Sequence, residues 1–511
     1  MTYLNPSSNS NPRPDQNRIH MTLTLALFLS LPTWSQALGD SGTINASASA
    51  INALDQRLRI QERLREIDGE NEKATAAKLE RAQVNSKGFG FISADSLFAL
   101  NIRGFGQTSG LYFLGNIGTA PSPGLNNYSV RRLQSDFAFT LYKHFNWRVH
   151  LDFAGGNVAL NDVNLDWKIH PRFNVRAGKF KPPTGLERLL SPWRTPFIEN
   201  SFVTLLQPNR DLGVQIFGEF GKVLFEYQVG VFDGARDGQN NTGDNNDDKD
   251  VYARIFSQPF LTTESELLEG FGVGISGSYG WQEQFNSSTV TSIVSTPTGT
   301  TTLTTAPPVT NGIAAYFTGT GRQGFFSYAA QDSSIGELIR YSPQAYWYSG
   351  PFGLIGEYSA TTQKVRRGTF EKNLTNSAWA VTGSWFLTGE KNAYKNIKVK
   401  NANAWPDSGY FGALEILGRF QRLKVDDSAF APLDPADLRL TLANPVTQAR
   451  IALAYALGLG WYFNSSVKLF FSYENTRFTG GAGTTATNKV APVIGNRQTE
   501  KVVSFSLNVN Y

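Results

Sequence analysis

Basic side chains are frequent between residues 101 and 210 of this 511-residue chain. Arginine can hold two oxygens of an oxyanion at once, because its guanidinium is a planar fork of N–H donors. Residues of this kind that could line a basic passage are Arg103, Arg132, Arg148, Lys168, Arg172, Arg176, Lys179, Lys181, Arg188 and Arg194. Anion binding or conduction is therefore the first chemistry to consider.

Other chemistries have little support in the sequence. The four histidines show no metal-ligand spacing, and the chain has no cysteine, so zinc is not indicated. The loop 233–250 holds six aspartates, but it lacks the regular spacing and closing glutamate of a calcium loop, which favours a solvated loop. We also find no nucleophile motif and no glycine loop for phosphate, so we predict that the chain is not an enzyme and binds no cofactor.

Strands must position these side chains, because apolar and polar residues alternate along most of the chain. In WRVHLDFA (147–154), Trp147 and Val149 share one parity, and Arg148 and His150 take the other. The last ten residues, VVSFSLNVNY, alternate in the same way up to Tyr511. Sixteen such segments follow Ser96, with short turns at 144–146, 170–171, 221–222, 349–352 and 464–466. We predict a closed all-β transmembrane barrel of about 16 antiparallel strands.

The composition agrees with a barrel. Mean hydropathy is -0.27, aromatic residues make up 13% of the chain, and no apolar run is long enough to span a membrane as a helix. Aromatic residues gather beside the short turns, which predicts an interfacial girdle that also holds Tyr511. Its predicted members are Phe145, Trp147, Trp167, Phe352, Trp385, Trp461, Tyr462 and Phe463.

The N-terminal region precedes the barrel. The apolar run Met21–Leu31 and the small residues Ser35 and Ala37 predict a signal peptide over 1–37, with the start at Met1 or Met21 left open. The segment 51–83 has apolar residues at helical spacing among seven basic and seven acidic residues, which predicts a charged helix. This helix either self-associates, for example as a coiled coil, or serves as a solvated spacer. We therefore expect a periplasmic helical segment and linker over 38–88 and a barrel over 89–511.

Charge is uneven around the predicted lumen. If apolar residues face lipid, ten basic and nine acidic side chains face inward, but the first five strands contribute six bases and three acids. The segment 172–210 adds five further bases against Glu187 and Glu199. A loop folded inward there would narrow a basic stretch. The alternative is that these charges form ion pairs that brace the wall.

Several stretches resemble the phosphate-selective porin O/P family. They include NIRGFGQ (101–107), NVRAGKFKPPTGLERLLSPW (174–193), SWFLTGEKNAY (384–394) and GLGWYFNSSVKLFFSYENTRF (458–478). The resemblance implies a trimeric outer-membrane barrel with a channel in each subunit and a basic constriction that passes anions. It also implies that Arg103 and the pair Arg131–Arg132 contact anions. Arg131 has the outward parity, so it can contribute only if a bulge or the channel mouth turns it inward.

Two departures from the family weaken the expectation for phosphate. Members that discriminate strongly carry closely spaced arginines in the loop that corresponds to 281–337, whereas this chain has only Arg322 there. Fourteen of the residues from 287 to 310 are serine or threonine, which predicts a flexible loop. Many members also have Glu-Arg where this chain has Glu199-Asn200.

We therefore expect a passive outer-membrane channel of a diderm bacterium that conducts small inorganic anions, phosphate among them, with moderate anion selectivity. Outer-membrane lipid and two further copies of the chain are the expected partners, and nucleic acid is not. A carbohydrate or general porin is the alternative, because eight aromatic residues have inward parity. They are Phe105, Phe180, Phe217, Phe232, Tyr252, Phe256, Tyr346 and Tyr348. A barrel adhesin or barrel enzyme has less support.

Overall fold

The computed structural model describes residues 41–77, 81–85, 88–115, 124–221, 224–241, 247–283, 290–296, 299–305, 313–395, 397–400, 409, 411–487 and 490–511. The chain divides into two units, Met1–Ala77 and Lys78–Tyr511, which are considered separately below. The predicted signal peptide lies outside the described residues. Within them, no helix is both long enough and apolar enough to cross a membrane.

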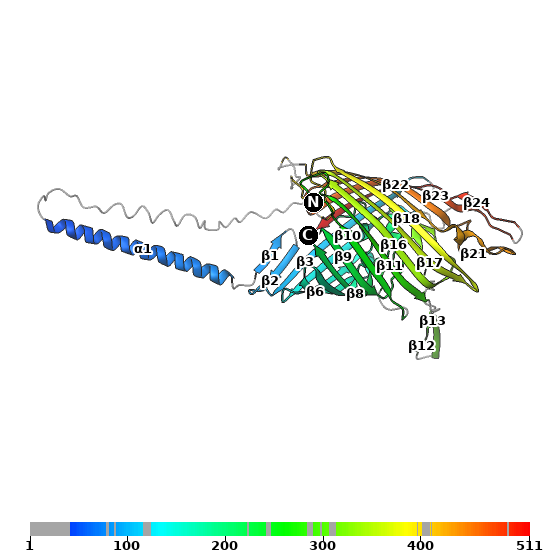
Figure 1. Cartoon of the computed structure of the whole chain (residues 1–511), viewed down its shortest axis with the longest axis horizontal. Coiled ribbons are helices and arrows are strands. Elements are labelled where there is room, and N and C mark those ends of the chain that lie inside the picture. Colours follow the sequence, from blue (N-terminus) through cyan, green and yellow to red (C-terminus); the bar gives the residue numbers. More distant parts are fainter. Residues whose placement is uncertain are drawn as a thin grey trace, which may run out of the picture. The chain divides into compact units, whose positions relative to one another are not determined.

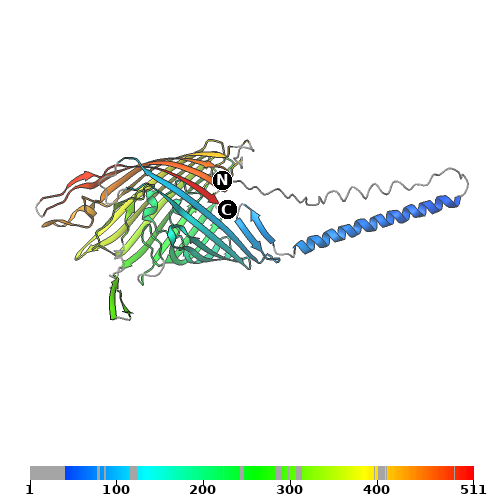
Figure 2. The same cartoon turned by 180° about the vertical axis from the view of Figure 1, so that it is seen from behind.

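Sixteen antiparallel strands form one closed barrel, which confirms the predicted fold (Figure 1). They are β3 (Phe98–Phe113), β4 (Asn127–Leu141), β5 (Phe145–Asp152), β6 (Ala159–His170), β7 (Phe173–Phe180), β8 (Asp211–Phe220), β9 (Phe225–Phe232), β10 (Asp250–Ser257), β11 (Phe271–Glu283), β16 (Ser333–Ser349), β17 (Phe352–Arg367), β18 (Phe370–Phe386), β19 (Ala413–Lys424), β22 (Ala449–Tyr462), β23 (Val467–Thr484) and β25 (Glu500–Asn510). The last strand, β25, pairs with β3 and closes the ring (Figure 2). Closure satisfies the edges that an open sheet would expose.

The last strand shows why the alternating sequence folds in this way. Leu507 and Val509 are exposed on the outer face, whereas Ser504 and Asn508 are buried on the inner face. Inside the barrel, Gln107 donates a hydrogen bond to Asn508 at 2.6 Å. Tyr511 exchanges backbone hydrogen bonds with Gly104, which keeps the end of the chain from fraying.

The two ends of the barrel differ. At one end, called the turn end, strands are joined by short turns such as 142–144, 171–172 and 350–351. At the other, called the loop end, the longer connections include 181–210 and 425–448. Aromatic rings stack near the turn end, for example Phe139 on the exposed Trp147 and Phe352 on Trp385. Tyr462 was predicted to join this girdle but faces inward and is buried, because its parity is opposite to that of Trp461.

The N-terminal helix α1 spans Ser41–Ala77. The prediction that a helix continues to Gln83 is wrong, because residues Arg81–Asn85 form strand β1, which pairs with β2 (Gly88–Ile92). The predicted boundary between residues 88 and 89 therefore falls inside β2. Apolar side chains of the helix are strongly exposed, with 67% of Ile51 and 53% of Leu64 accessible to solvent.

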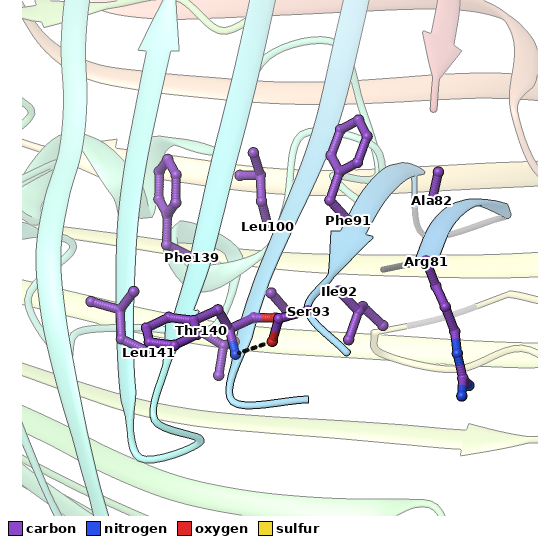
Figure 3. Close-up of a pocket in the computed structure, with 11 residues that line it drawn as sticks. Arg81, Ala82, Phe91, Ile92, Ser93, Leu100, Phe139, Thr140 and Leu141 are labelled. Atoms are coloured by element: carbon purple, nitrogen blue, oxygen red, sulfur yellow. Dashed lines mark hydrogen bonds between the residues drawn. The ribbon is translucent and has the colours of Figure 1, made fainter. Parts of the chain in front are cut away.

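The hairpin of β1 and β2 extends the barrel wall beyond the end of β25. Strand β2 pairs with the first residues of β3, Phe91 opposite Leu100, whereas β25 pairs with β3 from Phe105 onward. An apolar groove of about 470 Å³ lies between the hairpin, β3 and β4. Figure 3 shows Phe91, Leu100 and Phe139 along it. This hairpin was not expected from the sequence.

Short elements lie in the connections. The strands among them are β12 (Val290–Thr296), β13 (Gly299–Thr305), β14 (Tyr316–Phe317), β15 (Gly324–Phe326), β20 (Pro432–Asp434), β21 (Asp437–Thr441) and β24 (Val493–Asn496). The 3-10 helices are η2 (Ala154–Gly156), η3 (Glu187–Leu189), η4 (Phe202–Leu206) and η6 (Asp427–Phe430). Strands β12 and β13 form a hairpin within the Ser/Thr-rich loop that was predicted to be flexible. Threonine has high strand propensity, which agrees with this pairing.

Candidate functional site: the barrel lumen

The connection from β7 to β8, residues 181–210, folds into the barrel and is called the inner loop. It carries η3 and η4 and is anchored on the far wall. Glu357 of β17 accepts hydrogen bonds from the backbone N–H groups of Leu186 and Glu187, at 3.1 and 3.2 Å. Gln421 of β19 accepts one from the N–H of Phe202 at 2.8 Å. The inner loop therefore crosses the lumen in a fixed position.

An apolar cluster holds the inner loop against one side of the barrel. Phe202, Val203 and Leu206 of η4 are fully buried. They pack with Tyr316 and Phe325 from the connection between β11 and β16, and with side chains of β17–β19 and β22. Packed side chains fill this side of the lumen, so space for solutes must lie along the opposite wall.

A large cavity lies along that opposite wall. Its volume is about 1290 Å³, and strands β3–β7, β9 and β10 contribute to its lining together with residues 189–194 of the inner loop. Nine basic side chains line it, namely Arg103, Arg148, Arg176, Lys181, Arg194, Arg210, Arg254, Lys391 and Lys395. Six acidic side chains line it as well, namely Asp136, Asp162, Asp166, Glu226, Glu266 and Glu269. The lining thus has an excess of three positive charges.

Arginines and aspartates alternate across this wall. Asp136 contacts Arg103 at 2.8 Å and Arg148 at 2.6 Å. Asp162 contacts Arg148 at 3.3 Å and Arg210 at 2.8 Å. Five charged groups, from β3 across to the end of the inner loop at Arg210, therefore form a continuous ladder, in which the arginines outnumber the aspartates by one.

A second ion cluster lies beside the ladder. Asp166 accepts two hydrogen bonds from Arg176, at 2.6 and 2.8 Å, and lies 3.5 Å from Lys168. The ring of Phe217 lies 4.5 Å from the Lys168 ammonium and 5.1 Å from the Arg176 guanidinium. Both cations are thereby held in place on the wall, with side-chain exposures of 37% and 31%.

The connection from β18 to β19 enters the lumen from the turn end. Arg194 of the inner loop donates hydrogen bonds to the carbonyl oxygens of Ala393 and Tyr394 and to the side chain of Asn392. The Tyr394 hydroxyl donates in return to the carbonyl of Leu186 at 2.7 Å. Two inward segments from opposite ends of the barrel are therefore joined at Arg194.

Arg131 and Arg132 lie at a bulge of β4. Gln107 of β3 is opposite Arg132, and Thr108 is opposite Val130, so Arg131 has no partner in β3. The extra residue turns both guanidiniums inward. Arg131 donates two hydrogen bonds to Glu199 of the inner loop, at 2.5 and 2.8 Å. The bulge that the sequence analysis required for Arg131 is thus present.

Other candidate cations serve the inner loop itself. Lys181 donates to the carbonyls of Arg188 and Leu190 at 2.7 and 2.9 Å. Arg188 is buried and donates to the carbonyls of Thr204 and Gln207, so it braces the loop and does not line the cavity.

Five further candidates are also absent from the cavity lining, namely Arg131, Arg132, Lys168, Arg172 and Lys179. Arg172 is in the turn before β7, where its guanidinium lies 5.6 Å from the Phe220 ring. Lys179 is buried near the end of β7, with Arg210 and Asp162 as charged neighbours. Arg172 was expected at the pore on strand parity, and Lys179 as part of the basic segment 172–210. The positive φ of Gly178 interrupts the alternation just before Lys179.

Five of the eight inward aromatic residues line the cavity, namely Phe105, Phe180, Phe256, Tyr346 and Tyr348, but each of them is buried. Phe180, Phe232, Tyr252 and Phe256 are at most 2% exposed. Phe105, Tyr346 and Tyr348 are also buried, and Phe217 is covered by Lys168 and Arg176. A sugar needs an exposed ring face to stack on.

The structure also adds residues that the sequence analysis missed. Asp162 links three basic side chains of the wall, and Lys391 and Lys395 come from the connection 387–412. A signal for the two lysines existed, because a connection of that length is unusual at the turn end of a membrane barrel. Asp162 shares the parity of Asp166 and Lys168 in β6, so the alternation of that strand could have placed it inward.

We find no metal centre in the described part of the chain. Within it, no group of three or more histidine, cysteine, aspartate or glutamate side chains could hold a metal ion. Two aspartates of the loop 233–250 have another role, since Asp237 and Asp250 contact the buried Arg340 at 2.6 and 3.1 Å.

The chain is similar to several known proteins. The family model for phosphate-selective porin O and P matches residues 123–491. Porin O of Pseudomonas aeruginosa is 24% identical over 360 residues, which are 68% of this chain and 76% of that protein. An anion-selective porin from Comamonas acidovorans has 9% identity and a TM-score of 0.47, covering 81% of this chain and 100% of that one. The outer membrane channel DcaP of Acinetobacter baumannii has 10% identity and a TM-score of 0.45, covering 81% and 97%.

The family match extends over more than half of the chain. Porins are channels rather than enzymes. In outer-membrane barrels the short turns face the periplasm, so the turn end is the periplasmic end. The chain belongs to the phosphate-selective porin O and P family and is an outer-membrane porin.

Proposed function

We propose that this porin is a passive channel for small anions, phosphate among them, with moderate preference for anions over cations. The observation that carries the proposal is the excess of three positive charges in the cavity lining. A narrow aqueous passage between low-dielectric walls focuses the field of such charges and raises the local concentration of anions.

Phosphate should be favoured only weakly over chloride. Most of the candidate cations are already engaged, as with Arg176 at Asp166 and Arg131 at Glu199. A guanidinium whose N–H groups already bind a carboxylate has fewer donors left for a permeating oxyanion. The described residues of the connection between β11 and β16 add one further arginine, Arg322.

We also propose that the porin assembles as a homotrimer and that α1 lies in the periplasm, outside the barrel. The family and the exposed apolar stripe of α1 support this arrangement. On this view the mature chain comprises a helical segment up to Ala77 and a barrel domain that includes the β1–β2 hairpin.

The test is the zero-current potential of the purified porin in a planar bilayer under a KCl gradient. We expect the sign of an anion-selective channel for the wild type. The triple variant Arg103→Ala, Arg132→Ala, Arg176→Ala leaves Asp136, Asp166 and Glu199 less compensated. Its anion-to-cation permeability ratio should therefore fall about tenfold.

The control is a triple variant of equal charge change, Arg366→Ala, Arg439→Ala, Arg477→Ala. These residues are exposed and do not line the cavity. Its zero-current potential should match that of the wild type. A cation-selective wild-type channel would refute the proposed function, and an unchanged potential in the lumen variant would show that the constriction lies elsewhere.

A further inference from the structure

Three guanidiniums from two separate segments surround one carboxylate, that of Glu199. Arg131 forms the two short hydrogen bonds described above. Arg132 lies 3.8 Å from the carboxylate, and Arg322 approaches it to 3.9 Å from the connection between β11 and β16. Burial raises the pKa of Glu199, but the hydrogen bonds and charge of Arg131, with the charges of Arg132 and Arg322, bring the pKa below its usual value. Glu199 is therefore an anion within this cluster.

The cluster is reachable by solutes. The side chains of Arg131 and Arg322 are 29% and 35% exposed, whereas that of Glu199 is 13% exposed. The cations therefore present donors toward open space on one side and toward the carboxylate on the other. A carboxylate offers two oxygens to a guanidinium, as phosphate, sulfate and small organic acids also do.

The backbone of the inner loop is fixed at this point without help from the carboxylate. Arg132 donates to the carbonyl of Ile198 at 2.9 Å, and Arg419 donates to the carbonyl of Glu199 at 3.0 Å. Phe197 and Ile198 are buried next to them. Removal of the charge on Glu199 should therefore leave the loop in place.

We propose that Glu199 is a tethered anion that occupies an oxyanion site formed by Arg131, Arg132 and Arg322. A permeating phosphate or similar oxyanion competes with this carboxylate for the guanidiniums. The inference rests on the proposed function, and it identifies Glu199 as a residue that sets specificity.

Competition of this kind shortens the stay of an oxyanion in the channel. The tethered group is always present near the arginines, so a free anion must exceed its effective concentration, which is on the order of millimolar for tethered groups. Without the carboxylate the cluster carries three positive charges and no internal anion. Phosphate should then stay longer and obstruct the passage of chloride.

The experiment compares the wild type with Glu199→Gln in planar bilayers, using inorganic phosphate as the blocker of the chloride current. The glutamine keeps the size of the side chain and removes its charge. We expect the half-blocking phosphate concentration to fall about fivefold or more. The matched control is Glu371→Gln, because Glu371 also contacts two cations, Lys364 and Arg366, but lies at the start of β18 and is 39% exposed. Its block should equal that of the wild type.

Two further variants separate competition from a structural role. In the double variant Arg131→Gln, Glu199→Gln, the half-blocking concentration should rise again toward the wild-type value. Arg322→Gln alone should weaken the block and does not depend on changing the inner loop. If Glu199→Gln raises the current of anions and cations alike without stronger block, Glu199 only holds the loop and the inference is overturned.

Failure of this inference can be told from failure of the proposed function. A wild-type channel that selects cations would refute both. A wild-type channel that selects anions, together with an unchanged or weaker phosphate block in Glu199→Gln and an unchanged block in Arg322→Gln, would refute the tethered-anion site alone.

Discussion

The arginines of the lumen attract anions and also brace the wall. A charged side chain in a narrow lumen needs partners, because the low-dielectric wall around it makes an isolated charge costly. Asp136, Asp162 and Asp166 supply those partners for the wall, and backbone carbonyls supply them for Lys181 and Arg194. The resulting selectivity depends on the surplus of cations over these partners, which is small.

The charge of Lys181 should change with pH, which tests how the surplus of cations affects selectivity. Burial lowers its pKa to about 7, and the positive charges of Arg210 and Arg188 act in the same direction, while Asp162 opposes them. The lysine is therefore charged below pH 7 and neutral above it. We expect the anion-to-cation permeability ratio to be higher at pH 6 than at pH 8.

The matched variant is Lys181→Arg, which keeps the charge throughout this range and should flatten the pH profile. His150 is a second titratable group on the wall, 3.1 Å from Asp162, so the comparison is made in a His150→Gln background. If the permeability ratio depends on pH equally with and without Lys181→Arg, the pH dependence does not come from Lys181.

At the scale of the element, strand alternation made the barrel predictable from sequence. The periodicity of two places apolar residues on lipid and polar residues inside, and it holds through strands such as β5 and β25. It fails where the backbone departs from the regular pleat. The bulge at Arg131 reverses the expected direction of one side chain, and the fold of the inward connections depends on contacts distant in sequence, such as Arg194 with Asn392.

The junction at Arg194 leads to a prediction about the connection 387–412. Arg194→Gln removes charge-assisted hydrogen bonds to Asn392, Ala393 and Tyr394. Such bonds typically contribute about 1.5–3 kcal/mol each, so the connection should detach part of the time from the inner loop. We expect a larger single-channel conductance with more frequent current fluctuations.

Lys391→Gln provides the comparison for Arg194→Gln. Lys391 lies in the same connection and lines the same cavity, but its side chain is 76% exposed and its ion pair with Glu269 spans 4.0 Å. Its removal should change selectivity slightly without added fluctuation. If both variants show the same current fluctuations, these arise from the lost positive charge and not from detachment of the connection 387–412.

At the scale of the whole molecule, the fold class and the family were accessible from the sequence, whereas the boundary of the barrel domain was not. Helical spacing of Ile51, Leu54 and Leu58 predicts α1 correctly, but the residues after Ala77 carry too short an alternation to reveal β1 before its partner β2 is known. A two-stranded hairpin depends on the strand it joins, here β3.

This boundary determines which truncation tests the role of the helix. Removal of residues 41–77 takes away α1, which belongs to the first unit, and leaves the whole sequence of the second unit, Lys78–Tyr511. Removal through residue 88 would also delete β1 and break the pairing of β2, which leaves the first residues of β3 less protected.

We therefore expect the two truncations to differ. The shorter one should give a heat-modifiable barrel with wild-type conductance, and the longer one should assemble less well. Exposed apolar residues of α1 need a covering partner, and in a homotrimer the same stripe of the neighbouring subunits provides one. The shorter truncation should accordingly lower the temperature at which the trimer dissociates in detergent. An unchanged dissociation temperature would identify α1 as a solvated spacer, and failure of the shorter truncation to assemble would place the helix within the folding unit of the barrel.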